Sequence, residues 1–476
     1  LDLSGGWHDA GDYNKYIGGN APFNGDSGDA VFFLSTAFDL NATVWTDGQT
    51  NIPESGNGIP DILDEVEVGL DWYLKMQRPG GGVLSIVHTP TSGNPPVPLS
   101  TPPSADTGSR YYSSETPDST ALAGACLALG ARVLAPWDPG KAGTYQAAAV
   151  AAWGWLAANV SGTVLLESKL WFAAELYRLN PAGPSATVAQ AYVDGYAPWS
   201  VAGDCTSEWS TFAPGVTLQS HAWRAMIAYT FAAGATPAVT AGMRGQFAKL
   251  VDGALGSFAV AGPYGSGLRA AEYQWSSNRI KAMRGLLLVI AARLGATGTK
   301  TPAQTEQQAL WYLHYLCGVN ALNMLYATNM AGIGGEHSVW RIYHTWYPYG
   351  NANYYGKPPA TWEPDYPYYA GTDSIGISDN QTSTYGPFPG IVADGPVEFY
   401  PEAGCAAGGV TPPVGGLDGV SARHRFYRDW AFCCQGPDAT GAVACPWQVN
   451  ETGIYYISAF AALAGQFMSG SAKLTA

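Results

Sequence analysis

The chain has 476 residues and a formal net charge of −14, with 47% hydrophobic and 13% charged residues. The acidic balance argues against nucleic acid and anionic membrane surfaces as partners, and the apolar content excludes intrinsic disorder. No apolar run reaches the roughly 18 residues of a membrane span. With 17 Trp and 28 Tyr, the composition instead suits a neutral ligand rich in hydroxyl groups.

One domain is the better interpretation of this length. No Pro/Ser/Thr linker, charge block or low-complexity segment divides the chain, so we expect a single domain over residues 1–476. The first residue is Leu1 rather than Met, which is compatible with removal of a signal peptide or an accessory module upstream.

Two aspartates lie close together near the start of the chain. The stretch GGWHDAGDYNKYIGG at 5–19 places Asp9 and Asp12 three residues apart among glycines and aromatics, with no helical pattern. Neighbouring carboxylates repel each other, and a chain that keeps them together most often binds a metal or moves a proton. The alternative is that Asp9 caps a turn while Asp12 faces solvent.

Apolar residues at helical spacing predict ten helices along the chain. The predicted helices cover 28–40, 60–77, 118–134, 144–160, 168–180, 220–234, 241–255, 278–295, 304–318 and 451–468. Asp118, Ser119 and Asn278 occupy expected N-cap positions, and Gly295 and Gly318 occupy expected C′ positions.

Many of these predicted helices are rich in Ala and apolar nearly all round, whereas a helix facing solvent would carry a wide polar stripe. Two apolar faces suit a ring of helices packed inside a second ring. Strand-like alternation is scarce, and the segment 327–450 is long and irregular, which is typical of a functional loop region. The predicted fold is an all-α barrel with elaborate loops at one end.

Cysteine spacing gives no zinc signature, because none of the seven cysteines forms a CxxC pair. Cys126 and Cys317 lie in helical patterns, where we expect buried free thiols. Four others cluster in a loop-rich segment where one or two disulfides are plausible in an oxidising compartment; they are Cys405, Cys433, Cys434 and Cys445.

Aromatic residues dominate the predicted loops. A pyranose ring stacks its apolar face on an aromatic ring, so these residues are candidate sugar platforms, although each one alone is more often a packing residue. The aromatic residues that we predict to bind sugar are Trp209, Trp275, Trp340, Trp346 and Tyr347.

Five sequence blocks, in order, resemble glycoside hydrolase family 9, the inverting cellulases built on an (α/α)6 barrel. The blocks read SGGWHDAGDYNKYI, IPESGNGIPDILDEVEVGLDWYLKMQ, KLWFAAELY, GPFPG and WQVNETGIYYISAF. The resemblance extends over nearly the whole chain, from the first block near the start to the last near the end. The resemblance implies a catalytic domain of (α/α)6 type, with long loops that form a substrate cleft at one end.

The resemblance also implies roles for three carboxyl residues. Asp12 matches the general base of the family, Asp9 its neighbour that helps hold the attacking water, and Glu451 the general acid. Inverting glycosidases place acid and base about 6.5–9.5 Å apart so that a water fits between them. An acid that stays protonated near neutral pH needs apolar surroundings, for which Trp447 and Tyr455 are the candidates.

The family's sugar-contacting His-rich element is replaced here by GIGGEHSVWRIYHTWYPYG at 332–350, which resembles another branch of the family. His344 is therefore the candidate sugar-contacting histidine, with a hydrogen-bonded core histidine as the alternative. Glu336 in the same loop either binds a hydroxyl group or forms a structural ion pair.

No cofactor is expected for the chemistry itself. The stretch 79–117 lacks cysteine and has only His88, so the structural zinc of some family members is not expected. The family's calcium loops match poorly, but sites built from carbonyl and carboxylate oxygens are hard to see in sequence, so structural calcium stays open.

The sequence thus predicts a secreted, monomeric β-1,4-glucanase that acts on cellulose or related β-glucans. One alternative is an exo-acting glucosidase or glucosaminidase of the same family that trims short oligosaccharides. Another is a carbohydrate-binding protein with a degenerate site, which the three filled carboxyl positions disfavour.

Overall fold

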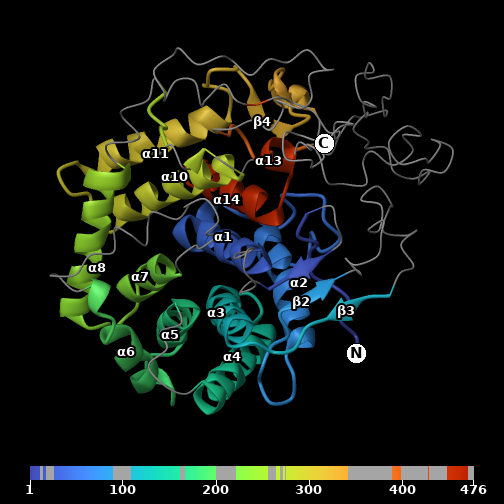
Figure 1. Cartoon of the computed structure of the whole chain (residues 1–476), viewed down its shortest axis with the longest axis vertical. Helices are drawn as coiled ribbons and strands as arrows, with labels where there is room; N and C mark the ends of the chain where they lie inside the picture. The colour runs from blue at the N-terminus through green and yellow to red at the C-terminus, as the bar shows by residue number, and fades with distance from the viewer. Residues whose placement is uncertain are drawn as a thin grey trace, which may run out of the picture.

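The computed structural model describes most of the helical core. The described residues are 1–10, 14–17, 26–88, 109–160, 167–199, 221–255, 264–268, 272–273, 275–340, 389–397, 427 and 447–469. Figure 1 shows the helices arranged around a common centre, with the first and last helices side by side.

An inner ring of helices forms the core of the molecule. Its described members are α1 (Asp26–Leu40), α3 (Pro117–Leu134), α5 (Glu167–Leu179), α7 (Ala222–Thr230), α10 (Ser277–Arg293) and α14 (Ile454–Gly465). α3 packs between α1 and α5, α5 packs on α7, and α14 packs between α10 and α1. The last helix therefore closes the ring against the first.

Outer helices cover this ring. They are α2 (Asp61–Met76), α4 (Pro139–Asn159), α6 (Ala186–Asp194), α8 (Pro237–Leu250) and α11 (Pro302–Leu316). Each packs on an inner helix: α2 on α1, α4 on α3, α6 on α5, α8 on α7 and α11 on α10. This double layer confirms the predicted all-α, (α/α)6-type barrel.

The composition of the inner helices explains why they tolerate two packed faces. α3 is buried almost all round, and the aromatic ring of Phe172 on α5 lies directly over Gly124 of α3. A side chain at that glycine would meet the ring at 2.3 Å, so the close approach of the two helices depends on the missing Cβ.

The ten predicted helices are all present, with boundaries shifted by a few residues, and the sequence pattern missed α6. The N-cap predictions were wrong. The N-cap of α3 is Thr116, which forms a capping box with Ser119, and Pro117 opens the helix; the N-cap of α10 is Ser276. A proline at the first helical position moves the cap one residue upstream of it.

The predicted C′ glycines are confirmed. Gly295 and Gly318 follow the C-caps of α10 and α11 with φ of 65° and 114°, a conformation that glycine adopts without strain.

Buried ion pairs hold the inner helices together at their centre. The carboxylate of Asp29 on α1 accepts hydrogen bonds from Arg224 on α7 and from Arg279 on α10, and all three side chains are buried. At the edge of the ring, Asn41 after α1 donates its side-chain amide to the carbonyl of Gly465 at the end of α14, at 2.7 Å. The C-terminal ends of α1 and α14 are therefore joined directly.

Short strands lie at the ends of the helices. β1 (Lys15–Tyr16), β2 (Ile86–His88) and β3 (Tyr111–Tyr112) form an antiparallel sheet in the order β1-β2-β3. β4 (Leu325–Thr328) and β5 (Ser338–Val339) pair in parallel. The segment 391–394 continues this second sheet, because Thr328 donates its N–H to the carbonyl of Ile391 and Ala393 donates its N–H to that of Tyr326.

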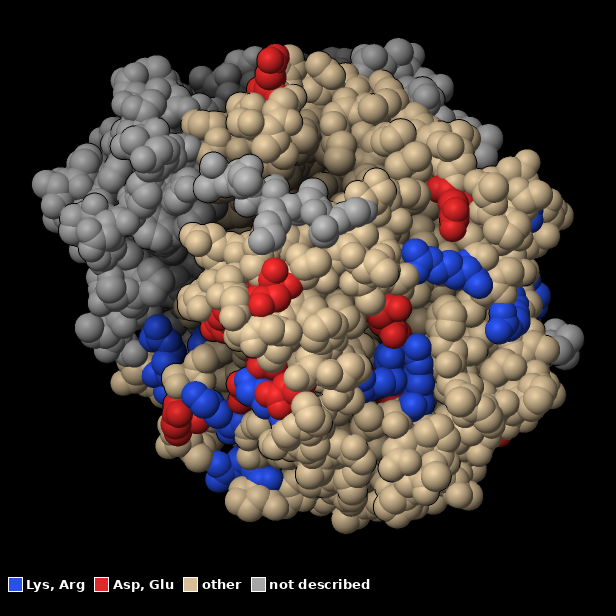
Figure 2. All heavy atoms as spheres, turned by 180° about the vertical axis from the view of Figure 1, so that it is seen from behind, with Lys and Arg blue, Asp and Glu red and all other residues tan. Residues whose placement is uncertain are grey.

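Charged side chains of both signs are interspersed on the face shown in Figure 2, where Lys and Arg lie beside Asp and Glu. Among the described helices, none is both long and apolar enough to cross a membrane.

The thiol predictions were half right. Cys126 is a buried free thiol, whereas Cys317 is free but exposed, because it caps α11 beyond the last buried turn. The four loop cysteines Cys405, Cys433, Cys434 and Cys445 lie outside the described residues.

Candidate active site

Glu451 lies at the junction between α13 (Trp447–Asn450) and α14, and its side chain is half-buried. The indole N–H of Trp275 donates a hydrogen bond to its Oε2 at 2.8 Å. The Trp275 ring in turn packs edge-on against Tyr456 of α14, with ring centroids 6.4 Å apart. An aromatic pair thus fixes one oxygen of the carboxyl group and leaves the group at the surface of the core.

Asp9 lies beside this carboxyl segment, although the two are nearly a full chain length apart in sequence. The backbone N–H of Ile454 donates to the carbonyl of Asp9 at 3.1 Å, and the N–H of Asp9 donates to the carbonyl of Asn14 at 2.8 Å. The Asp9 side chain is only 8% exposed. Closure of the ring therefore brings Asp9 against the start of α14, whereas Asp12 lies outside the described residues.

Trp7 anchors the segment that carries Asp9 to α2. Its indole N–H donates to Glu65 on α2 at 2.7 Å, and its ring covers Gly69 on the same helix. Gly69 leaves the space that the ring fills, since a Cβ there would lie 2.5 Å from it. Trp7 is therefore a packing residue that fastens this segment to α2 two residues before Asp9.

A second carboxyl group lies behind Glu451, and sequence reasoning missed it. Asp394 is fully buried, and its backbone N–H donates to the carbonyl of Glu451 at 3.1 Å. Burial, and next the charge of Glu451, raise the pKa of Asp394 well above its usual range. The sequence signal is weak: a single Asp follows the apolar run IVA in the GPFPG-containing segment, without a helical or strand period.

Of the predicted sugar-contacting residues, the structure describes Trp275, Trp340 and Glu336. Trp275 contacts Glu451 as described above. Trp340 follows β5 and is 36% exposed, and Glu336 is exposed in the turn before β5. Among the described residues no ion pair of Glu336 is found. His344, Trp209, Trp346 and Tyr347 lie outside them.

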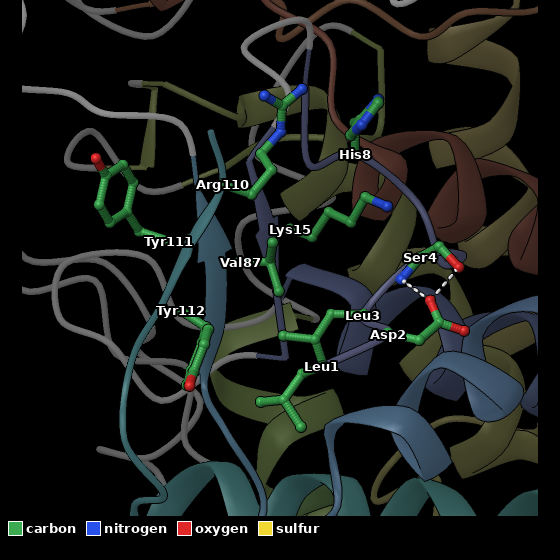
Figure 3. A pocket seen from close by; sticks show the side chains of 10 residues that line it. All are labelled: Leu1, Asp2, Leu3, Ser4, His8, Lys15, Val87, Arg110, Tyr111 and Tyr112. Carbon is green, nitrogen blue, oxygen red and sulfur yellow. Dashed lines mark hydrogen bonds between the residues drawn. The ribbon is translucent and has the colours of Figure 1, made fainter. Parts of the chain in front are cut away.

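A cavity of about 570 Å³ opens next to the Asp9 loop. Figure 3 shows that His8, Lys15 and Arg110 line its upper part, while Tyr111 and Tyr112 of β3 flank it. Both tyrosines are about half exposed, at 51% and 54%. His8, which lines this cavity, directly precedes Asp9 in the chain.

The described residues hold no group of three or more His, Cys, Asp and Glu side chains arranged to bind a metal ion. The expectations about calcium and zinc stay predictions.

The fold is a double-ring α-barrel, and the segments of Asp9 and Glu451 form an acidic site at one end of it. The sequence model of "Glycosyl hydrolase family 9" matches residues 1–464. The chain belongs to glycosyl hydrolase family 9.

Two curated relatives show how far the similarity extends. Endoglucanase C of Cellulomonas fimi is 30% identical over 368 residues, which are 71% of this chain and 31% of that protein. The xyloglucan-specific endo-β-1,4-glucanase BoGH9A of Bacteroides ovatus is 42% identical over 91 residues, 19% of this chain and 14% of that protein. The chain thus matches less than a third of the length of either relative.

Solved structures share the fold along nearly the whole chain. A metagenome-derived family 9 endoglucanase superimposes with a TM-score of 0.67 at 25% identity, covering 98% of this chain and 72% of that one. AaCel9A in complex with a cellobiose-like isofagomine gives a TM-score of 0.65 at 22% identity, with 98% and 75% covered. At 22% identity, the second similarity supports the barrel fold alone.

Proposed function

We propose that the chain hydrolyses β-1,4-glucans with inversion at the anomeric carbon. Glu451 protonates the leaving oxygen, Asp12 draws a proton from the attacking water, and Asp9 helps to hold that water. The observation that carries the proposal is the contact of the Asp9 segment with the start of α14, where the Trp275 indole holds the Glu451 carboxyl.

This arrangement suits glycoside cleavage for a physical reason. The reaction needs one protonated carboxyl at the leaving oxygen and one ionised carboxylate on the opposite face of the sugar. The Trp275 indole orients the Glu451 carboxyl through its Oε2, and the backbone hydrogen bond from Ile454 to Asp9 holds the Asp9 segment against the start of α14.

The substrate class follows from the family and from the aromatic residues at the loop end. Relatives include proteins named endoglucanase, cellulose 1,4-β-cellobiosidase and xyloglucan-specific endo-β-1,4-glucanase. The glucosidase and glucosaminidase alternative receives no support from the relatives named here. We further propose that the enzyme works as a secreted monomer, since a polymeric glucan does not cross a membrane, and that His344 and the loop aromatics bind glucosyl units.

The test is product analysis on cellohexaose in oxygen-18 water. Wild type should place the label on the new reducing end and release the α-anomer first, seen by proton NMR before mutarotation. Glu451→Gln and Asp12→Asn should each lose at least about a thousandfold in kcat.

Glu306→Gln, on the exposed face of α11, is the matched control and should keep the wild-type kcat. Release of the β-anomer would contradict inversion. An unchanged Glu451→Gln rate would remove Glu451 from the acid role, and intact cellohexaose with cleaved chitosan oligosaccharides would favour the glucosaminidase alternative.

A further inference from the structure

A groove of about 410 Å³ lies along the outer face of α11 and shares no lining residue with the carboxyl site described above. Ala303, Gln307 and Trp311 are spaced four residues apart, so they form one row along the helix. At 1.5 Å per residue the row is about 12 Å long. Tyr312, on the other side of the helix, lies against Gly285 of α10 (Figure 1). The groove therefore faces away from the inner ring. Its lining residues are Lys300, Ala303, Gln304, Gln307, Gln308 and Trp311.

Trp311 contributes an aromatic ring that is both exposed and fixed. Its side chain is 36% exposed, and the ring lies directly on the backbone of Gly265, where a Cβ would be only 2.5 Å away. That backbone is itself held to α11, because the hydroxyl of Tyr312 donates to the carbonyl of Gly267 at 2.9 Å. A ring that is already fixed loses little conformational entropy when a ligand stacks on it.

Two exposed glutamines bring hydrogen-bonding groups into the same groove. Gln304 and Gln307 both line it, and each side-chain amide offers an acceptor oxygen and two donor N–H groups. Gln304 uses its Oε1 to accept the N–H of Thr301 at 2.9 Å, so its amide NH₂ is the part that can donate to a ligand. Of the lining residues only Lys300 carries a charge. Neutral amides beside an aromatic ring suit a neutral ligand rich in hydroxyl groups rather than an anion.

We propose that this groove is a second carbohydrate site, which binds a β-1,4-glucan chain outside the candidate active site. Trp311 stacks on the apolar face of a pyranose ring, and the amides of Gln304 and Gln307 form hydrogen bonds with its hydroxyl groups. The volume of the groove lies within the ~300–1,000 Å³ that is usual for small-molecule sites. The proposal rests on the proposed function, because its ligand is the polymer that the active site is proposed to cleave.

The place of α11 in the fold gives this second site a use. The C-terminal end of α11 lies next to β4, and β4 is hydrogen-bonded to the segment 391–394, which in turn bonds to the backbone of Glu451. The row that ends at Trp311 thus runs toward the end of the barrel that carries the carboxyl groups. A polymer held at α11 stays near the active site between cleavages, because its second binding event is intramolecular. A short oligosaccharide needs only the active site.

The test combines binding to microcrystalline cellulose, measured in the cold, with turnover of cellohexaose. Trp311→Ala removes the stacking ring, so its partition coefficient on cellulose should fall about tenfold or more. Its kcat/KM on cellohexaose should not fall with it, because the short substrate reaches the active site without the groove. Trp311→Phe keeps an aromatic ring and should retain most of the cellulose binding.

Gln307→Ala tests the same site without disturbing the packing of Trp311 on Gly265. The position is exposed and alanine favours the helix, so the variant should fold, and its cellulose binding should fall about threefold with the loss of one amide. Trp137→Ala is the matched control. Trp137 is 45% exposed, packs edge-on against Phe38 with ring centroids 6.4 Å apart and does not line the groove. Its loss should leave cellulose binding at the wild-type level.

The outcomes separate the groove from the proposed function. Folded Trp311→Ala and Gln307→Ala variants with the wild-type partition on cellulose would overturn the groove, while cleavage of cellohexaose would still support the proposed function. A groove that joins two copies of this chain would change the sedimentation coefficient of Trp311→Ala and leave its partition unchanged, which also overturns the proposal. If wild type leaves cellohexaose intact, the proposed function fails, and weaker cellulose binding by Trp311→Ala would still support the groove.

Discussion

At the scale of single residues, the site depends on hydrogen bonds that hold carboxyl groups in fixed directions. Glu451 receives its donor from Trp275, a residue that sequence reasoning placed among the sugar platforms. The sequence predicted an aromatic residue at the site, but it did not predict that Trp275 would bond to Glu451. The two residues are far apart in sequence and meet only after the ring has closed.

The hydrogen bond from Trp275 is open to a direct test. Trp275→Phe removes the indole N–H and keeps an aromatic ring against Tyr456. We expect kcat on cellohexaose to fall about tenfold or more, since Glu451 gains negative charge as it gives up its proton in the transition state, and a hydrogen bond to a charged group contributes ~1.5–3 kcal/mol.

The matched control for this variant is Trp45→Phe. The indole of Trp45 donates to the carbonyl of Ala37 at 3.2 Å, away from Glu451, so its loss should leave kcat unchanged. Equal rates for wild type and Trp275→Phe would show that Glu451 needs no donor from Trp275.

At the scale of elements, helix propensity and packing act in opposite directions. Glycine inside a helix is unfavourable by ~1 kcal/mol relative to alanine, yet α3 contains two glycines and α4 contains three. Some of these glycines permit close contact between the rings, and others face open space.

Two glycines separate these effects. Gly124→Ala places a Cβ 2.3 Å from Phe172, so overpacking should lower the free energy of unfolding by about 1–3 kcal/mol despite the gain in propensity. Gly154→Ala on α4 meets nothing within 4 Å and should raise it by ~0.5–1 kcal/mol.

Denaturant unfolding at neutral pH, followed by circular dichroism, measures both changes. Opposite signs for the two glycine variants support the account of the double ring, whereas stabilisation by Gly124→Ala would show that α3 and α5 can move apart.

The helical elements followed from the sequence because apolar spacing and local composition define them. The ten predicted helices are present, and so are both C′ glycines. The short α6 was missed because only three of its nine residues are buried, so its apolar pattern is weak. Asp394 was missed because its contacts come from Ser276, Tyr456 and Glu451, which lie in other segments.

At the scale of the whole molecule, ion pairs at the rim link neighbouring inner helices. Asp39 at the end of α1 pairs with Arg132 of α3 at 2.9 Å and with Arg178 of α5 at 3.0 Å. Burial alone would raise the pKa of Asp39, but the two guanidinium groups outweigh it and hold the pKa below its usual range.

The sign of the pH effect follows from this lowered pKa. The stabilisation from Asp39 is complete above the pKa of an unfolded Asp, about 3.9, and is lost as the pH falls through the lower folded value. Asp39→Asn should therefore lower the free energy of unfolding by about 2 kcal/mol at pH 7, with a smaller difference near pH 3.

Thermal unfolding across this pH range checks the Asp39 prediction. Asp2→Asn serves as the control, because Asp2 pairs with Lys75 at the exposed surface and should leave the unfolding temperature unchanged at pH 7. An Asp39→Asn effect that is as large at pH 3 as at pH 7 would assign the loss to packing rather than to charge.

Ring closure by α14 has a consequence for the timing of activity during synthesis. Asp9 is synthesised well before Glu451, and the Ile454–Asp9 link forms only when both segments are present. A nascent chain, or a fragment cut short by a premature stop or by proteolysis before α14, carries the proposed base without the proposed acid. Under the proposed mechanism such products are inactive, so hydrolytic activity is expected only once α14 has closed the barrel.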